Sequence, residues 1–161
     1  NDVLQIQDTI EGFSSKINQV AKSKLHGDFM VIARIESLIL EAGIEDAINR
    51  AFAYVEAGAD GIMIHSRKKS PDEIFNFSSL FRKKYTKIPL ICVPTSYNTV
   101  YEKELIANGF NVVIYANQLL RAAYPAMYKT AESILTHQRA FEADEQLMSI
   151  KDILKLIPGT V

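Results

Sequence analysis

Polar side chains that can bind a small anion follow short apolar runs of this sequence. Arg34 and Glu36 come at the end of one run, and His65 comes directly after the next. The planar guanidinium of Arg34 can hold a carboxylate or a phosphonate through two parallel hydrogen bonds. His65 can donate a further hydrogen bond or move a proton near neutral pH. With the amide of Asn117, which follows a later run, these residue types predict an anion-binding site.

Each of these residues also has a purely structural interpretation. Arg34 can serve only as an ion-pair partner of Glu36, and His65 can be an ordinary hydrogen-bonding residue of the fold. Asn117 is a residue type favoured at helix N-caps. Glu36 can support a metal ion through a water molecule or can pair only with Arg34. The residues alone leave these alternatives open.

The elements that must position this site are four runs that are almost continuously apolar, as strands buried on both faces are. A segment with helical periodicity follows each run, which predicts an α/β fold of parallel βα units. In such folds ligands bind at the carboxyl ends of the strands, where the polar residues lie. The predicted strands are residues 29–33, 61–64, 88–93 and 111–115.

The helix boundaries are predicted from apolar stripes and capping residues. Two amphipathic helices are expected over residues 10–20 and 47–55, the second closed by a left-handed Gly58. A helix is expected to start at Ser70 as N-cap, with Pro71 at its first position and Glu73 completing a capping box, and Thr99 and Glu102 predict a similar capping box for the next helix. A helical stretch is expected over residues 119–141, and Pro125 inside it predicts either a start near Tyr124 or a kink. A short helix is expected over residues 149–154.

The composition excludes several classes of protein. Among 161 residues, 18 Lys and Arg balance 19 Asp and Glu, so binding to nucleic acid or to an anionic membrane surface is not expected. No apolar stretch has the roughly 20 residues of a membrane span. The single Cys92 permits no internal disulfide and fits a reducing, cytoplasmic setting. We expect one domain over residues 1–161, either an open sheet or part of a (β/α)8 barrel, since a whole barrel takes roughly 250 residues.

Five motifs in the same order resemble the phosphoenolpyruvate mutase and phosphonopyruvate hydrolase branch of the isocitrate lyase superfamily. Residues 31–37 resemble its "VARVEA" strand, and residues 56–67 resemble its "AGADAILMHSK" block. The other three are residues 93–97, which resemble "VPTxY", residues 113–122, which resemble "VIWANHxLRA", and residues 149–153, which resemble "SVKEI".

The resemblance implies the second half of a (β/α)8 barrel, from an enzyme that acts on a small phosphonate or 2-oxo acid with Mg²⁺ bound. The implied reaction interconverts phosphoenolpyruvate and phosphonopyruvate, with Arg34 and His65 as catalytic and substrate-binding residues and Asn117 as a further binding residue. The direct Mg²⁺ ligands are expected upstream, which leaves Glu36 as the one candidate for a supporting contact. We therefore expect the chain to be part of a longer enzyme that forms a homo-oligomer. Phosphonopyruvate hydrolysis, or a non-catalytic half-barrel used in assembly, remains an alternative.

Overall fold

The apolar runs form four parallel strands that lie in chain order, β1-β2-β3-β4, across one sheet. The computed structural model describes residues 6–157 and residue 159. The strands are β1 (Ile32–Ile35), β2 (Gly61–Ile64), β3 (Leu90–Cys92) and β4 (Val112–Val113). The helices are α1 (Ile10–Lys22), α2 (Gly43–Glu56), α3 (Asp72–Arg82), α4 (Glu102–Ala107), α5 (Gln118–His137), the 3₁₀ helix η1 (Phe141–Gln146) and α6 (Ile150–Lys155).

The chain divides into two compact units, residues 1–116 and residues 117–161. The first unit contains the sheet with α1 to α4, and the second contains α5, η1 and α6. In the described part of the chain, no helix combines the length and the apolar character needed to cross a membrane.

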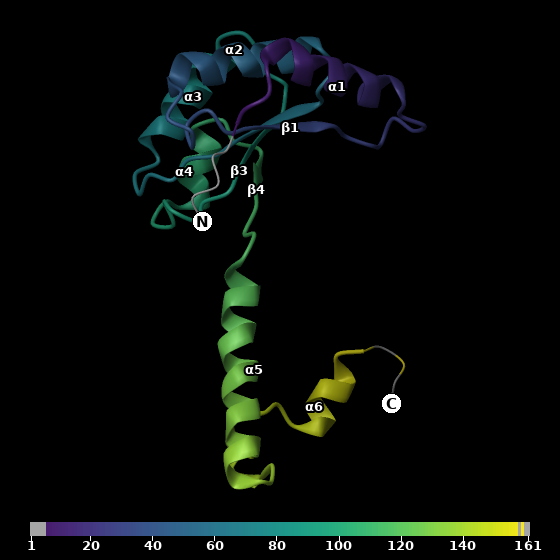
Figure 1. Ribbon diagram of the computed structural model, residues 1–161, viewed down its shortest axis with the longest axis vertical. Helices are drawn as coiled ribbons and strands as arrows, with labels where there is room; N and C mark the ends of the chain where they lie inside the picture. Colours follow the sequence, from purple (N-terminus) through teal and green to yellow (C-terminus); the bar gives the residue numbers. More distant parts are fainter. Residues whose placement is uncertain (1–5, 158, 160–161) are drawn as a thin grey trace. The chain divides into compact units, whose positions relative to one another are not determined.

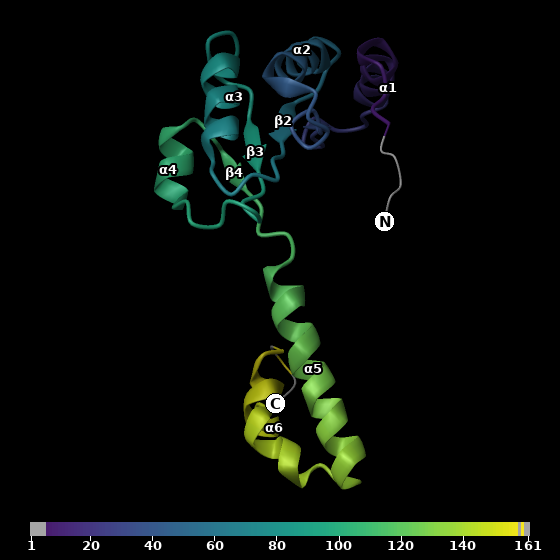
Figure 2. The same cartoon turned by 60° about the vertical axis from the view of Figure 1, so that its left-hand side comes forward.

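The core of the first unit lies between the sheet and the helices α1, α2 and α3, which pack on one face of it (Figures 1 and 2). Successive residues of a strand point to opposite faces. Ala33 and Ile35 of β1 belong to this core, so Arg34 faces the other side of the sheet. The same alternation places Ile64 in the core and directs His65 to the face that Arg34 occupies.

Gly61 opens β2 at a point where neighbouring side chains meet over the sheet. A Cβ atom added there would lie 2.8 Å from Cδ1 of Ile32, 3.2 Å from the carbonyl oxygen of Pro89 and 3.3 Å from Cδ1 of Ile91. Glycine therefore lets the side chains of β1 and β3 close over this end of β2.

The strands agree with the predicted runs except at their ends. β1 begins at Ile32, because the amide of Val31 donates to the Asp60 carboxylate (2.6 Å) instead of to a neighbouring strand. Phe29, predicted to lie in the strand, is 59% exposed. β3 begins at Leu90, since the preceding Pro89 has no amide hydrogen to donate. β1 ends at Ile35, so Arg34 lies inside β1 rather than after it.

Two predicted helix starts are wrong in detail. α3 begins at Asp72, and Ser70 accepts the amide of Asp72 (3.3 Å) as predicted, but Glu73 does not complete the capping box and instead contacts Ser66 and Lys68 at the end of β2. α4 begins at Glu102, and the carboxylate that accepts the amide of Tyr101 (2.9 Å) belongs to Glu104. Glu102 accepts from the hydroxyl of Tyr115 (2.8 Å), so neither Glu73 nor Glu102 caps its helix as predicted.

The remaining helices follow the sequence more closely. α1 and α2 cover the predicted stripes, Gly58 has the left-handed φ of 108° that ends α2, and Ser149 caps α6. α5 runs from Gln118 through Pro125, so a start near Tyr124 is wrong. It ends at His137, where Gln138 takes a φ of 55°, rather than continuing to residue 141.

Candidate functional site

Arg34 and His65 meet at the carboxyl ends of β1 and β2. The register pairs Arg34 with Met63 and Ile35 with Ile64, so His65 lies one step beyond the paired residues. An Nη2 atom of Arg34 lies 2.7 Å from Nδ1 of His65, which is a hydrogen-bond distance. The parallel strands thus bring together the two residues that the sequence predicted as a pair. Their roles in binding or catalysis remain predictions.

Glu36 holds the other end of the same guanidinium. Its Oε1 accepts from Nε of Arg34, the ion pair that we expected as the structural alternative. Arg34 is therefore fixed at two atoms, by a carboxylate on its own strand end and by an imidazole on the next strand. Within the described part of the chain, these contacts use two of the five guanidinium N–H groups and leave the others for a ligand.

The contact with Arg34 determines which nitrogen of His65 carries its proton. An arginine stays protonated and can only donate, so Nδ1 of His65 accepts and Nε2 carries the hydrogen. Burial lowers the pKa of His65, and the positive charges of Arg34 and Arg67 lower it further, while Glu36 opposes them. His65 is therefore a neutral donor through Nε2, beside a permanent cation.

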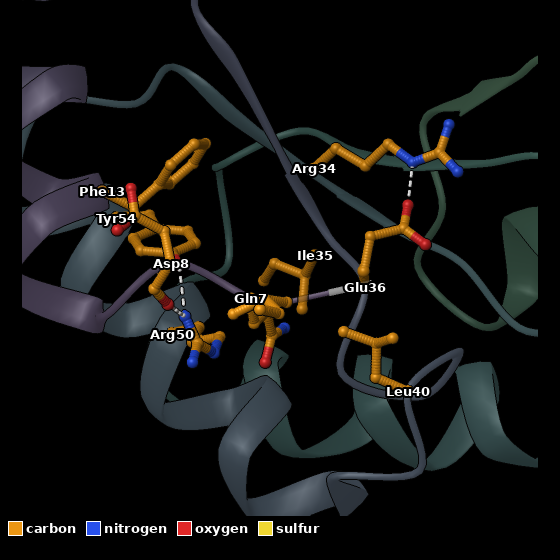
Figure 3. A pocket seen from close by; sticks show the side chains of 10 residues that line it. Gln7, Asp8, Phe13, Arg34, Ile35, Glu36, Leu40, Arg50 and Tyr54 are labelled. Atoms are coloured by element: carbon orange, nitrogen blue, oxygen red, sulfur yellow. Dashed lines mark hydrogen bonds and ion pairs between the residues drawn. The ribbon is translucent and has the colours of Figure 1, made fainter. Parts of the chain in front are cut away.

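A cavity of about 590 Å³ opens beside β1. Arg34 and Glu36 lie on one side of it, and Asp8, Arg50 and Tyr54 lie on another (Figure 3). His65 is not among its lining residues, although it contacts Arg34. The space is large enough for a small organic anion beside a fixed guanidinium.

Sequence reasoning missed the polar residues that support this site. Ser37 and Arg50 are buried, and they meet through Asp46. At the end of β2, Ser66 is also buried and donates to Glu73 (2.6 Å). The available signals were a serine directly after Glu36 and an Asp–Arg pair spaced by four residues on one helix.

Asn117 lies at the N-cap position of α5, in the second unit. Its Oδ1 accepts from Nη1 of Arg121 at 3.4 Å. The site residues Arg34 and His65 belong to the first unit. The contact between Asn117 and the substrate therefore stays a prediction.

The residues described here do not make up a magnesium site. Mg²⁺ takes several oxygen ligands in octahedral geometry. Among residues 6–157 and 159, no group of three or more histidine, cysteine or acidic side chains is placed to hold a metal ion. Glu36 is a single carboxylate and is paired with Arg34.

Comparison with known families supplies the context for this geometry. The family model described as phosphoenolpyruvate phosphomutase matches residues 1–135. The chain belongs to the phosphoenolpyruvate phosphomutase family.

Members of this family similar to the chain include a hydrolase as well as mutases. The chain is 40% identical over 148 residues to phosphonopyruvate hydrolase of Variovorax sp. (strain Pal2), covering 91% of the chain and 50% of that protein. It is 35% identical over 147 residues to phosphoenolpyruvate phosphomutase of Tetrahymena pyriformis, covering 91% of the chain and 48% of that protein. The chain spans about half the length of these relatives.

The solved structures in the phosphomutase family confirm the fold class. A crystal structure of phosphonopyruvate hydrolase in complex with oxalate and Mg²⁺ matches with a TM-score of 0.83 at 40% identity, covering 92% of this chain and 52% of that chain. The four βα units are half of the (β/α)8 barrel of these enzymes.

Proposed function

We propose that the protein carrying this chain interconverts phosphonopyruvate and phosphoenolpyruvate. The observation that carries the proposal is the pairing of Arg34 with His65 at the carboxyl ends of two neighbouring parallel strands. A permanent cation and a neutral N–H donor side by side fit the phosphonate or carboxylate of such a substrate. Membership in the phosphomutase family supports the same choice of substrate.

The reaction needs positive charge and positioning more than covalent help from the protein. In phosphonopyruvate the carbon–phosphorus bond breaks, and its electron pair stays on carbon as the enolate of pyruvate. The enolate oxygen then takes the phosphoryl group, which gives phosphoenolpyruvate. A loose phosphoryl transition state spreads negative charge over the phosphoryl oxygens. Arg34 and Nε2–H of His65 supply fixed donors for that charge.

Hydrolysis of phosphonopyruvate is the second candidate, favoured by the 40% identity to the Variovorax hydrolase. In this reaction a water oxygen bonds to phosphorus as the carbon–phosphorus bond breaks, and the enolate carbon takes a proton. The products are phosphate and pyruvate. The same Arg34–His65 pair would bind the phosphonate in either reaction.

We also propose that Mg²⁺ takes part, that Asn117 contacts the substrate and that the protein is cytoplasmic. We include Mg²⁺ because the similar hydrolase structure contains it together with oxalate. Its ligands would come from the rest of the intact protein, with Glu36 as a supporting contact through water. Asn117 would be the third residue that contacts the substrate. The protein would act in the cytoplasm.

The deciding experiment follows the phosphorus of phosphonopyruvate by ³¹P NMR, with the intact protein and Mg²⁺ present. Formation of phosphoenolpyruvate supports the mutase, and formation of inorganic phosphate with pyruvate supports the hydrolase. If the folded protein forms neither phosphoenolpyruvate nor inorganic phosphate, both reactions are contradicted and a non-catalytic half-barrel is favoured.

A further inference from the structure

A polar cluster of buried and half-buried side chains joins the loop that carries Glu36 to α2. We call it the Ser37 cluster, and it consists of Gln7, Ser37, Asp46, Arg50 and Tyr54. Ser37 is fully buried, and Arg50 is only 8% exposed. Ser37 contacts Asp46 of α2, whereas its neighbour Glu36 contacts Arg34.

Ser37 is held on both sides by hydrogen bonds. Its hydroxyl donates to Oδ2 of Asp46 at 2.6 Å and accepts from Nε2 of Gln7 at 3.2 Å. The same Asp46 oxygen accepts from Nε of Arg50 at 2.9 Å. One carboxylate oxygen on α2 therefore joins the end of β1 to a buried arginine.

Arg50 is fixed in turn by one partner far away in the sequence and one on its own helix. Its Nη1 donates to the carbonyl oxygen of Asp8 at 2.8 Å and to the hydroxyl of Tyr54 at 2.9 Å. Arg50 is buried, so its charge would be left without a partner if Asp46 moved away, which favours keeping the ion pair in place. The ion pair fixes the position of the oxygen that Ser37 contacts.

The loop between β1 and α2 transmits this position to the anion site. The amide of Leu40 donates to the carbonyl oxygen of Glu36 (3.0 Å), and the amide of Ala42 donates to that of Ser37 (2.9 Å). These bonds tie Glu36 and Ser37 into one hydrogen-bonded turn, so the position of Ser37 constrains that of Glu36. Glu36, one residue away, is the carboxylate that holds Nε of Arg34. Arg34 and members of the cluster also line the same cavity (Figure 3).

We propose that Asp46, acting through Ser37 and Glu36, is a positioning residue that sets the orientation of the Arg34 guanidinium for its anionic substrate. The inference rests on the proposed function, since Arg34 must bind substrate for its orientation to matter. In this view the Asp46–Arg50 pair on α2 supports catalysis although neither residue contacts the ligand.

The test is a double-mutant cycle in the intact protein, measured as kcat/KM for phosphonopyruvate. Asp46→Asn removes the charge, and Ser37→Ala removes the link to Glu36 while leaving the Asp46–Arg50 pair in place. We expect each to lower kcat/KM by about 10-fold to 100-fold, because small displacements of a positioned group are costly. In an Arg34→Lys background, both should have less than a threefold further effect, since the guanidinium that they orient is gone.

Glu56→Gln is the matched control. Glu56 lies on the same helix and pairs with Lys84 at 2.6 Å, away from the Ser37 cluster. This variant should keep wild-type kcat/KM, and its effect should be the same in both backgrounds.

The outcomes distinguish failure of the substrate-binding role of Arg34 from failure of the positioning role of Asp46. If Arg34→Lys alone leaves kcat/KM unchanged, the proposed substrate clamp fails and the positioning role falls with it. If Arg34→Lys is impaired but Ser37→Ala and Asp46→Asn are without effect, or multiply fully with it, the positioning role alone is overturned. If Asp46→Asn does not fold, the Ser37→Ala cycle decides by the same criterion.

Discussion

Arg34 has a guanidinium held at two of its nitrogens, one by Glu36 and one by His65. A lysine at this position would keep the charge but present a single ammonium in place of the planar fork. The two interpretations of Arg34, substrate clamp and ion-pair partner, differ in what this change does to turnover.

The first prediction is that Arg34→Lys lowers both kcat and kcat/KM for phosphonopyruvate by about 100-fold or more. This is the usual size of the effect when one preorganised electrostatic contact to the transition state is removed. Steady-state kinetics of the intact protein measure it, with Arg67→Lys, an exposed neighbour, as the control. Near-normal turnover of the Arg34→Lys variant would show that the arginine serves only its ion pair with Glu36.

The second prediction concerns the proton on His65. Burial and the charge of Arg34 lower its pKa in the folded protein. On acidification through the ordinary value of about 6.5, the unfolded chain therefore takes up this proton first, and the free energy of unfolding falls. This contribution to stability is complete above that range and decreases toward the lower pKa of the folded state.

An NMR titration of His65 checks the direction. The measured pKa should lie below the ordinary value, and Arg34→Met should raise it, because a neighbouring positive charge is removed. A pKa at or above the ordinary value in the wild-type protein would contradict the observed arrangement, in which Nδ1 accepts from Arg34.

At the scale of single elements, β2 depends on a close approach that only glycine permits. Gly61 faces side chains of β1 and β3, and the carbonyl of Pro89, 3.2 Å from an added Cβ, also accepts from the amide of Ile62. Ile32 can move the end of its side chain, but that carbonyl is part of the pairing between β2 and β3.

The third prediction is that Gly61→Ala lowers the free energy of unfolding by about 1–3 kcal/mol, as overpacking of a core does. Urea denaturation of the intact protein measures this difference. Gly27→Ala is the control, since an added Cβ there has no atom within 4 Å and should change stability little. Equal stability of the two variants would mean that β2 has more room than its neighbours indicate.

The elements also show how far sequence reasoning extends. The apolar runs and stripes identified every strand and most helices, and parallel strands made the meeting of Arg34 and His65 predictable. Periodicity is a local signal, however, and it misses contacts with distant partners. Val31 is removed from β1 by a carboxylate 29 residues away. Arg50 meets the carbonyl of Asp8 across 42 residues, so no local pattern could place the Ser37 cluster.

At the scale of the whole molecule, the second unit buries little of its apolar surface. No residue of α5 is buried, and large side chains form one stripe along it at helical spacing. The stripe consists of Leu120, Tyr124, Met127, Tyr128 and Leu135, all at least 60% exposed. Exposed apolar surface of this extent is typical of protein–protein contacts.

The fourth prediction is that the intact protein is a homo-oligomer that depends on this stripe. Tyr128→Glu should shift its sedimentation toward smaller species, because a carboxylate is costly to bury without a partner. Thr136→Glu adds the same charge to α5 at an exposed position outside the stripe and should leave the mass of the assembly unchanged. A wild-type protein that sediments as a monomer would contradict the prediction.

The double attachment of Arg34 also has a thermodynamic consequence. A long, flexible arginine side chain ordinarily loses conformational entropy when it closes on a ligand, and that loss weakens binding. Here Glu36 and His65 already restrict the guanidinium before any anion arrives. The entropy is lost once, when the chain folds, so its cost lowers the stability of the protein instead of its affinity for the ligand.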